Sequence, residues 1–412
     1  MLPEKTLAWG LSRSCIRELA EYGAGRKKEI GAENVYDFSL GNPSVPSPSC
    51  VDESILDLIR ANLEKEHPAD GHRKGAAEGL GGGSIHGYTT AAGLLSLREK
   101  IAADLNGRFG LGITPNLLYV TCGAAASLTI TLKAVLLPGD EVIAIAPFFP
   151  EYRVFTEGQG GKLVVVPAAS DFQIDLDAFA GALSEHTRAV IINSPNNPSG
   201  AVLSEANLVA MTNLLKAHEE KTGRSIYLIS DEPYREIVYD GVDNPCALQH
   251  YDDAIMCYSF SKSLSVPGER IGYIAVSPRV KDADQVYASV MGAGRCLGYV
   301  NPPSLFQRVI ERCIGQTADV SEYKANRDCL CSGLKALGYE YVEPQGAFYL
   351  FVKALEPDAK AFSDRAKKHE LLLVPSDDFG CTGYVRLSYC VDRSVIENSM
   401  PAFKALMEEY CR

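Results

Sequence analysis

Apolar and polar positions alternate along the chain in a pattern typical of a parallel α/β sheet. From about residue 94, short runs rich in valine, isoleucine and leucine are separated by segments with helical periodicity. The strand-like runs are LLYVTCG, EVIAIAPF, KLVVVPA, AVIINSP, SIYLISDE, AIMCYSFS and IGYIAV. Continuous apolar runs indicate strands that are buried on both faces. The pattern predicts an α/β fold whose large domain has a mostly parallel sheet flanked by helices.

Two of the helices that precede or separate these strands can be placed from the sequence. Leu94, Leu97, Ile101 and Leu105 recur at helical spacing, which predicts a helix with one apolar face. Ser204 precedes another helical segment, where a serine can accept a hydrogen bond from the free N–H groups of the first turn. We therefore expect a helix to begin directly after Ser204.

The pattern changes after about residue 300. A long helical stretch leads into the alternating run GAFYLFV, a short strand YVRLSY and a terminal helix, which together predict a smaller α+β domain. The segment before residue 46 is too short to fold alone and is expected to pack with the C-terminal part. We predict an N-terminal arm with part of the small domain (1–45), a large cofactor-binding domain (46–300) and a small C-terminal domain (301–412).

Composition and charge exclude several classes of protein. The 412 residues are 46% hydrophobic and 22% charged, and the net charge of −12 argues against a general nucleic-acid binder or a protein of anionic membranes. We expect no secretory signal and no membrane span, and hence a cytoplasmic protein. The twelve cysteines lack zinc-site spacing, so we expect reduced thiols and no metal. The glycine-rich segment 71–87 lacks the spacing of a phosphate loop and is predicted to be a mobile loop.

Polar residues follow the ends of several predicted strands. Ligands of parallel α/β sheets bind beyond the carboxyl ends of the strands. Asp231, Asn197 and Lys262 all lie at such ends, and the residues after Gly123 begin a helix whose free N–H groups favour a phosphate. Each residue alone has an ordinary structural explanation, as a turn, a cap or a solvated lysine. Together, they predict a ligand site at this edge of the sheet.

Three segments in combination resemble the class I/II aminotransferases, which are fold-type I pyridoxal-phosphate enzymes. They are SFSKSLSVPGERIG, NSPNNPSG and ISDEPYREI. The segments FSLGNP, HGYTTAAGLLSLREKIA, TCGAAASL, PFFPEY, PQGAFYLF and YVRLSY also occur in the family's order, so the resemblance spans roughly residues 37–390. It implies the fold-type I architecture, the cofactor pyridoxal 5′-phosphate (PLP) and a homodimer with shared active sites.

The resemblance also implies roles for residues around the cofactor ring. Lys262 would bond to the cofactor aldehyde and, once released, move a proton on the substrate. Asp231 would keep the pyridine nitrogen protonated. Tyr234 and Asn197 would hydrogen-bond the ring 3-oxygen, and Phe149 would stack on the ring face.

Further residues would bind the phosphate and the substrate. The resemblance implies that the phosphate is bound by the backbone N–H groups of Ala124 and Ala125, by Ser259 and by Arg270, with Tyr88 reaching across from the neighbouring subunit. Gly123 is also proposed as a cofactor-binding residue. The substrate carboxylate would bind to Arg386, in a pocket also lined by Gly41 and Asn197. Two departures from the family's pattern are noted: alanines stand in the phosphate loop, and Ser376 replaces a glycine in PSDDFG.

Arg295 is a candidate for substrate choice. It precedes Tyr299, Asn301, Pro302 and Pro303, as does the arginine that binds the distal carboxylate in aspartate aminotransferases, but it lies one residue further from the tyrosine. The alternative is a surface arginine on a loop.

Three functions are compatible with the sequence. The first is a PLP-dependent aminotransferase that moves an amino group between an L-amino acid, with aspartate or glutamate as candidates, and a 2-oxo acid. The second is a PLP-dependent β-lyase that cleaves a C–S bond, because the same cofactor residues serve both reactions. The third is an aminotransferase-like regulatory protein, which we disfavour because only about forty residues precede the first family motif.

Overall fold

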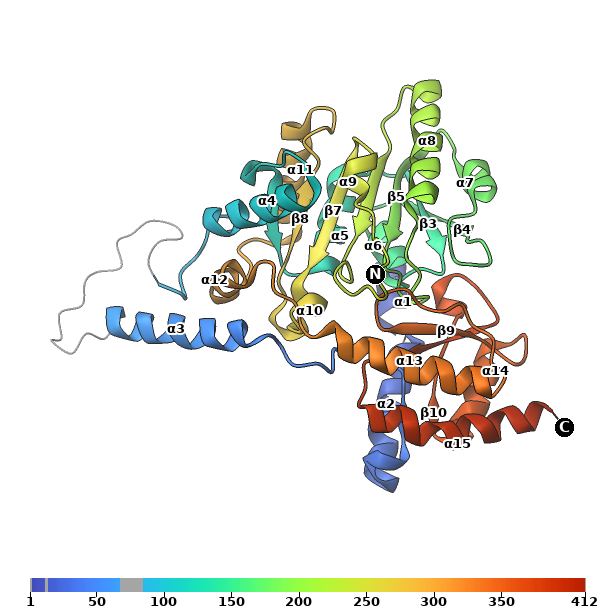
Figure 1. Cartoon of the computed structure of the whole chain (residues 1–412). Helices are drawn as coiled ribbons and strands as arrows, with labels where there is room; N and C mark the ends of the chain where they lie inside the picture. Colours follow the sequence, from blue (N-terminus) through green and yellow to red (C-terminus); the bar gives the residue numbers. More distant parts are fainter. Residues whose placement is uncertain (1, 12–13, 67–83, 412) are drawn as a thin grey trace.

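The computed structural model describes residues 2–11, 14–66 and 84–411, and these contain a large seven-stranded β-sheet, a small three-stranded sheet and a two-stranded pair (Figure 1). The large sheet has seven strands in the order β2-β8-β7-β6-β5-β3-β4. Its strands are β2 (Leu118–Thr121), β3 (Glu141–Ala146), β4 (Lys162–Pro167), β5 (Thr187–Asn193), β6 (Tyr227–Asp231), β7 (Ala254–Ser259) and β8 (Gly272–Val276). Within this sheet, β8 pairs antiparallel with its neighbours β2 and β7, and the other pairs are parallel. The predicted mostly parallel sheet is confirmed.

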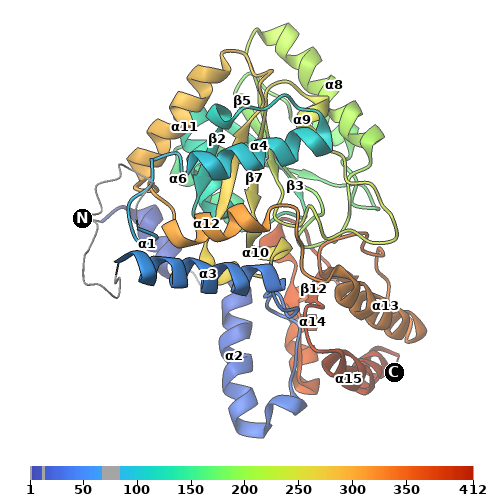
Figure 2. The same ribbon diagram turned by 60° about the vertical axis from the view of Figure 1, so that its left-hand side comes forward.

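Helices cover both faces of the large sheet (Figures 1 and 2). They are α4 (Leu95–Phe109), α5 (Ala124–Val135), α6 (Glu151–Gly158), α7 (Leu176–Ala182), α8 (Glu205–Thr222), α9 (Ala247–His250) and α11 (Ala283–Leu297). The two predicted helices are present. Leu97, Ile101 and Leu105 are buried on one face of α4. Ser204 Oγ accepts a hydrogen bond from the Asn207 N–H at 3.2 Å, as an N-cap does.

The small sheet contains β11 (Val374–Pro375), β12 (Tyr384–Ser388) and β9 (Tyr349–Lys353), all antiparallel. The nearby helices are α13 (Val320–Ala336), α14 (Ala359–Ala366) and α15 (Arg393–Tyr410). The N-terminal segment contributes α2 (Cys15–Ile30) and β1 (Tyr36–Asp37), and β1 pairs in parallel with β10 (Leu371–Leu372). The N-terminal and C-terminal segments therefore lie side by side, and the exact domain limits stay a prediction.

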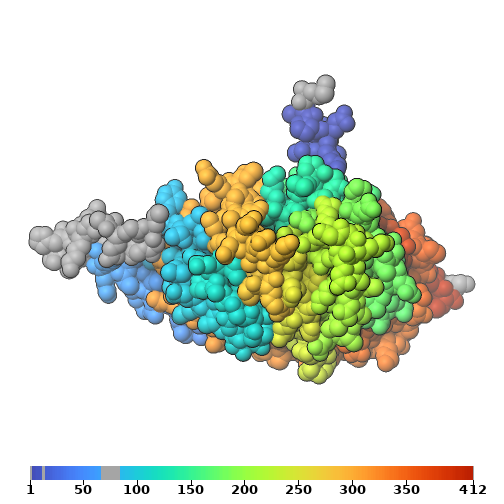
Figure 3. Space-filling model, turned by 90° about the horizontal axis from the view of Figure 1, so that it is seen from above, coloured from blue at the N-terminus to red at the C-terminus, as the bar shows by residue number. Residues whose placement is uncertain are grey.

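The remaining helices lie between or outside these layers. They are α1 (Glu4–Leu11), α3 (Ser49–Glu66), α10 (Phe260–Ser263) and α12 (Ser304–Cys313). Short 3-10 turns span Ala32–Asn34, Pro115–Leu117, Pro267–Glu269, Lys367–His369 and Asp377–Phe379. Figure 3 shows α1 standing out from the body of the molecule. Among the described helices, none is long and apolar enough to span a membrane. Most of the glycine-rich segment 71–87 lies outside the described residues.

Candidate active site

A pocket of about 300 Å³ is lined by residues from both sheets and from the N-terminal segment. Eleven of the residues proposed for the site from the sequence line it: Gly41, Ala124, Ala125, Phe149, Asn197, Asp231, Tyr234, Ser259, Lys262, Arg270 and Arg386. The large sheet places many of them together because the parallel strands β5, β6 and β7 end at the same edge.

Asp231 ends β6 at the base of the pocket and is buried. The Tyr152 hydroxyl donates a 2.5 Å hydrogen bond to Asp231 Oδ2, and Asn193 Nδ2 donates to the Asp231 main-chain oxygen at 2.8 Å. Asp231 Oδ1 has no hydrogen-bond partner among the described residues. Burial raises the pKa of Asp231 to about 7, although the Tyr152 hydrogen bond acts in the opposite direction. A buried carboxylate oxygen of this kind fits a ligand with an N–H⁺ donor.

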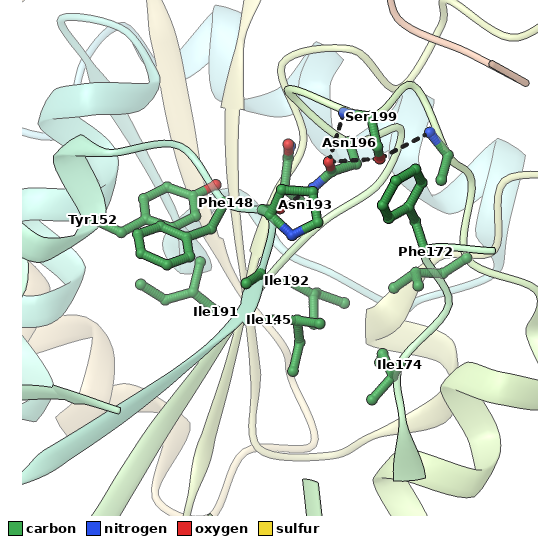
Figure 4. Close-up of a pocket in the computed structure, with 14 residues that line it drawn as sticks. Ile145, Phe148, Tyr152, Phe172, Ile174, Ile191, Ile192, Asn193, Asn196 and Ser199 are labelled. Atoms are coloured by element: carbon green, nitrogen blue, oxygen red, sulfur yellow. Dashed lines mark hydrogen bonds between the residues drawn. The ribbon is translucent and has the colours of Figure 1, made fainter. Parts of the chain in front are cut away.

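Tyr152 and Asn193 were not predicted as site residues. Both border a second, much smaller cavity of about 30 Å³, which Figure 4 shows with Phe148 and Asn196 among its walls. Its lining combines apolar side chains with the polar residues Asn193, Asn196 and Ser199. The sequence held a signal for Tyr152, because it closes the segment PFFPEY that follows β3.

Lys262 lies on α10, a single turn whose N-cap is Ser259. Ser259 Oγ accepts from the Ser261 N–H at 3.2 Å. Lys262 Nζ donates to the Gly41 main-chain oxygen at 2.7 Å. Burial lowers the pKa of Lys262 to about 8, and the positive charges of Arg270 and Arg386 act in the same direction. A lysine with this pKa has a substantial neutral fraction near neutral pH, as a nucleophilic amine requires.

The opposite end of the pocket is suited to an anion. Helix α5 begins at Ala124, where its first N–H groups have no partner within the helix. Arg270 lies beside this turn, and a Cβ at Gly123 would be 3.0 Å from Arg270 Nη2. Gly123 also has φ +91°, a conformation that favours glycine. Gly123 therefore does not line the pocket itself but lets the guanidinium approach the helix terminus.

Arg386 of β12 is buried, and within the described residues it forms no ion pair with a carboxylate. Its Nη1 donates to Asn197 Oδ1 at 3.2 Å and its Nη2 to the Ser39 main-chain oxygen at 2.5 Å. Its Nε has no partner there. A buried guanidinium without a counter-ion fits an anionic ligand group that supplies the missing charge.

Two tyrosines form the wall between the sheets. The hydroxyls of Tyr234 and Tyr349 are 2.9 Å apart, and the Arg386 guanidinium stacks over the Tyr349 ring at 4.8 Å. A Cβ on Gly41 would collide with the Tyr349 hydroxyl, so only glycine fits there. Tyr349 was not predicted as a site residue, although it lies in the segment PQGAFYLF. Ile16 of α2 also lines the pocket and carried no signal in the sequence.

Two of the proposed residues lie away from the pocket of this chain. Tyr88 is 80% exposed. Arg295 is exposed in the last turn of α11, so the alternative that placed it on a loop is wrong about its secondary structure. Ser376 has φ −81° and precedes the turn at Asp377–Phe379, so a glycine is not required there.

Fold and pocket together define an enzyme in which a buried amine, a buried carboxylate and an anion-binding helix terminus face one cavity. The model of the family "Aminotransferase class I and II" matches residues 55–403, and the chain belongs to this family. It is therefore a transferase that moves an amino group between an amino acid and a 2-oxo acid, and the β-lyase alternative is not favoured.

Named relatives agree with this assignment. The chain is 31% identical over 363 residues to the aspartate aminotransferase of Thermotoga maritima, covering 87% of each chain. It is 30% identical over 354 residues to the aspartate/prephenate aminotransferase of Thermus thermophilus, covering 83% of this chain and 87% of that one. A crystal structure of an amino transferase from Eubacterium rectale matches with a TM-score of 0.93 and 48% identity over the whole of both chains. The fold-type I architecture is confirmed.

Proposed function

We propose that this aminotransferase binds PLP in the pocket between the two sheets and uses it to move the amino group of an L-amino acid to a 2-oxo acid. One observation carries the proposal. Lys262 and Asp231, whose buried Oδ1 has no partner among the described residues, line the same pocket, and the α5 terminus and Arg270 line it as well. PLP has an aldehyde, a basic ring nitrogen and a phosphate, and these three groups match the three features.

PLP, when bound, supplies a carbonyl that takes up amines and a ring that withdraws electrons from the substrate. Residues of the chain would bind the ring and the phosphate and hold the proton on the ring nitrogen. Asp231 Oδ1 would accept the hydrogen bond of the pyridine N–H and hold its proton there. Tyr234 and Asn197 would hydrogen-bond the ring 3-oxygen, and Phe149 would pack on the ring face. The N–H groups of the α5 terminus, with Ser259 and Arg270, would bind the phosphate.

The same pocket would orient the substrate. Arg386 would bind the α-carboxylate through its free Nε and one of its Nη atoms, which offers two parallel hydrogen bonds. This places the substrate Cα beside Lys262, whose neutral amine would remove and return the Cα proton. Gly41 and Tyr349 would exclude water from that side, since they are in close contact.

We also propose a homodimer with shared active sites. Leu56, Ile59 and Leu63 recur at helical spacing on α3 and are each at least 40% exposed, which is unusual for large apolar side chains on one face. Tyr88 follows α3 in the chain and is also exposed. A two-fold axis beside α3 would cover the apolar stripe and bring Tyr88 to the partner subunit's phosphate site.

The names of the relatives and the state of the cysteines support proposals for the substrate and the compartment. Several relatives are named aspartate or aspartate/prephenate aminotransferases, and Arg295 would bind a distal carboxylate across the dimer. We therefore propose aspartate or glutamate as a donor. All twelve cysteines are free, which supports a reducing cytoplasm as the compartment.

The experiment that tests this function is a donor screen with the PLP-loaded enzyme and 2-oxoglutarate as acceptor. Loss of the cofactor's visible absorption on addition of an amino acid, and its return on addition of the 2-oxo acid, is the expected result. Lys262→Ala is the control and should show neither change. Pyruvate release from a cysteine conjugate without any acceptor would contradict the proposal and favour the β-lyase.

A further inference from the structure

The helix that carries Lys262 is too short to hold itself in place. α10 has four residues, and a single helical turn is unstable in water because nucleation of a helix is unfavourable. Two main-chain hydrogen bonds anchor its ends. The Phe260 N–H donates to the Ile271 oxygen at 3.1 Å, and the Ala318 N–H donates to the Ser263 oxygen at 2.7 Å. The position of the lysine therefore depends on contacts from outside the helix.

A buried series of side-chain hydrogen bonds supplies a further anchor. The Tyr258 hydroxyl lies 2.8 Å from Glu236 Oε2 and 2.9 Å from Ser263 Oγ. A phenol has one proton and a carboxylate can only accept, so Tyr258 donates to Glu236 and accepts from Ser263. Arg108 Nη1 donates to the other oxygen of Glu236 at 3.1 Å. The path Arg108–Glu236–Tyr258–Ser263 is therefore continuous.

These four residues link the segment that follows Asp231 to the helical turn that carries Lys262, and they do so outside the pocket. Glu236 stands five positions after Asp231 in the same segment, and Ser263 is the direct neighbour of Lys262. None of the four lines the pocket. They line a separate cavity of about 180 Å³ that also contacts Phe260 of α10. Tyr258 is 5% exposed and stacks on Tyr273, with ring centres 4.9 Å apart. The phenol is thus rigidly placed and acts on the pocket only through α10.

We propose that Tyr258 is a positioning residue that holds α10, and with it the Lys262 amine, at a fixed place relative to Asp231. The inference rests on the proposed function for the role of Lys262. Without the hydroxyl, the Glu236 carboxylate loses a donor and Ser263 loses an acceptor in a buried region. The single turn then keeps its main-chain anchors and the Ser259 cap but loses the side-chain link at Ser263, so the amine is held less firmly and becomes more hydrated.

Tyr258→Phe tests the proposal, with Tyr251→Phe as the matched control. Tyr251 is equally buried, and its hydroxyl donates to the Ile226 main-chain oxygen at 3.0 Å, but it does not line the pocket. Tyr258→Phe loses the hydrogen bonds to Glu236 and Ser263, and Tyr251→Phe loses the bond to the Ile226 main-chain oxygen, so both variants should be destabilised. Only the first variant should change the environment of Lys262.

The first readout needs no cofactor. Lys262 in the cofactor-free protein is labelled with acetic anhydride over a range of pH, and the labelled peptide is measured by mass spectrometry. The charged or titratable groups that act on this amine are Arg270, Arg386 and Cys390, and all three remain in both variants. We expect the midpoint of labelling to rise by about half a pH unit in Tyr258→Phe, because the amine becomes more hydrated. The midpoint in Tyr251→Phe should equal that of the wild type.

The second readout is the split between kcat and KM in the loaded enzyme. We expect kcat of Tyr258→Phe to fall about tenfold with KM nearly unchanged, because Arg386 is not affected. If Tyr258→Phe does not fold, Ser263→Ala removes the same link and should move both readouts in the same direction. Wild-type values in Tyr258→Phe, or equal shifts in both tyrosine variants, would overturn the proposal. Full activity of Lys262→Ala would instead contradict the proposed function, independently of the results for the Tyr258 variant.

Discussion

The hydroxyl of Tyr152 holds one carboxylate oxygen of Asp231 at 2.5 Å, while the other oxygen has no partner among the described residues. Tyr152 therefore fixes one oxygen of a carboxyl group that lines the pocket, and the other oxygen is buried without a partner. The two oxygens of the carboxyl group therefore have different functions. Tyr152 sets the position of the carboxylate, and Asp231 Oδ1 is left to bind a ligand.

We predict that Asp231→Asn lowers turnover by at least about 100-fold, because an amide cannot keep the pyridine nitrogen protonated. Tyr152→Phe should lower turnover much less, since Oδ1 remains available. Single-turnover kinetics with the loaded enzymes measure both effects. A rate for Asp231→Asn within a few-fold of the wild type would remove Asp231 from the proposed role.

The stability of the cofactor-free protein should depend on Asp231. Burial raises its pKa from the ordinary value of 3.8 to about 7, so between these values the folded state keeps a proton that the unfolded chain has released. The free energy of unfolding therefore falls as the pH rises through this window. Asp231→Asn lacks this effect and should gain stability relative to the wild type as the pH rises. Denaturant titrations on both sides of the window measure the difference, and a constant difference would contradict the prediction.

Lys262→Ala should abolish transamination and weaken PLP binding without eliminating it, because the phosphate and ring contacts remain. In the wild type, the pKa of about 8 means that the neutral amine grows with pH and is the main form above that value. The rate of PLP attachment should therefore rise with pH and level off above that pKa. Stopped-flow absorbance measures this rate, and a pH-independent rate would be the contrary result.

Arg386→Leu should raise KM for the amino acid by about 10- to 100-fold, the usual value of a charged, buried hydrogen bond, and leave PLP affinity unchanged. Arg279→Leu is the control, because Arg279 forms a surface ion pair with Asp252 and lies outside the pocket. Steady-state kinetics and a PLP titration separate the two constants. An unchanged KM would mean that the substrate carboxylate does not bind to Arg386.

Arg295→Ala should reduce the preference for aspartate over alanine and leave the rate with alanine nearly unchanged. The reason is that the side chain is exposed in one chain and would contact only the distal carboxylate in a dimer. The ratio of kcat/KM for the two donors is the measurement. Equal efficiency of the wild type on both donors, or an unchanged ratio in the variant, would rule out Arg295 as the specificity residue.

Much of the pocket could be predicted from the sequence because many of its residues lie at the carboxyl ends of parallel strands. Asp231, Asn197 and Lys262 each follow a buried parallel strand, and strand order alone brings such positions together. The fold class and the two helix predictions depended on equally local patterns.

Other parts of the site depend on contacts between distant segments. Ile16 reaches the pocket only because α2 lies against the small sheet. The residues around Ile16 in the sequence do not predict this long-range contact. Tyr152 and Tyr349 lie in the segments PFFPEY and PQGAFYLF of the family resemblance, but only the partners of their hydroxyls in the fold indicate a role for them. The loop alternative for Arg295 fails because α11 continues to Leu297 and ends at Gly298, and a helix end is the part of a helix that local patterns locate least well. The roles of all these residues stay predictions.

The hydrogen bond from Arg386 to the Ser39 main-chain oxygen joins positions 347 residues apart, and that from Lys262 to Gly41 joins positions 221 apart. A ribosome makes the N-terminal partner of each pair long before the C-terminal one. Until β12 has been made, β9 and β11 lack the central strand with which both of them pair. A chain that stops before residue 384 would have Lys262 but not Arg386, so its pocket would be incomplete.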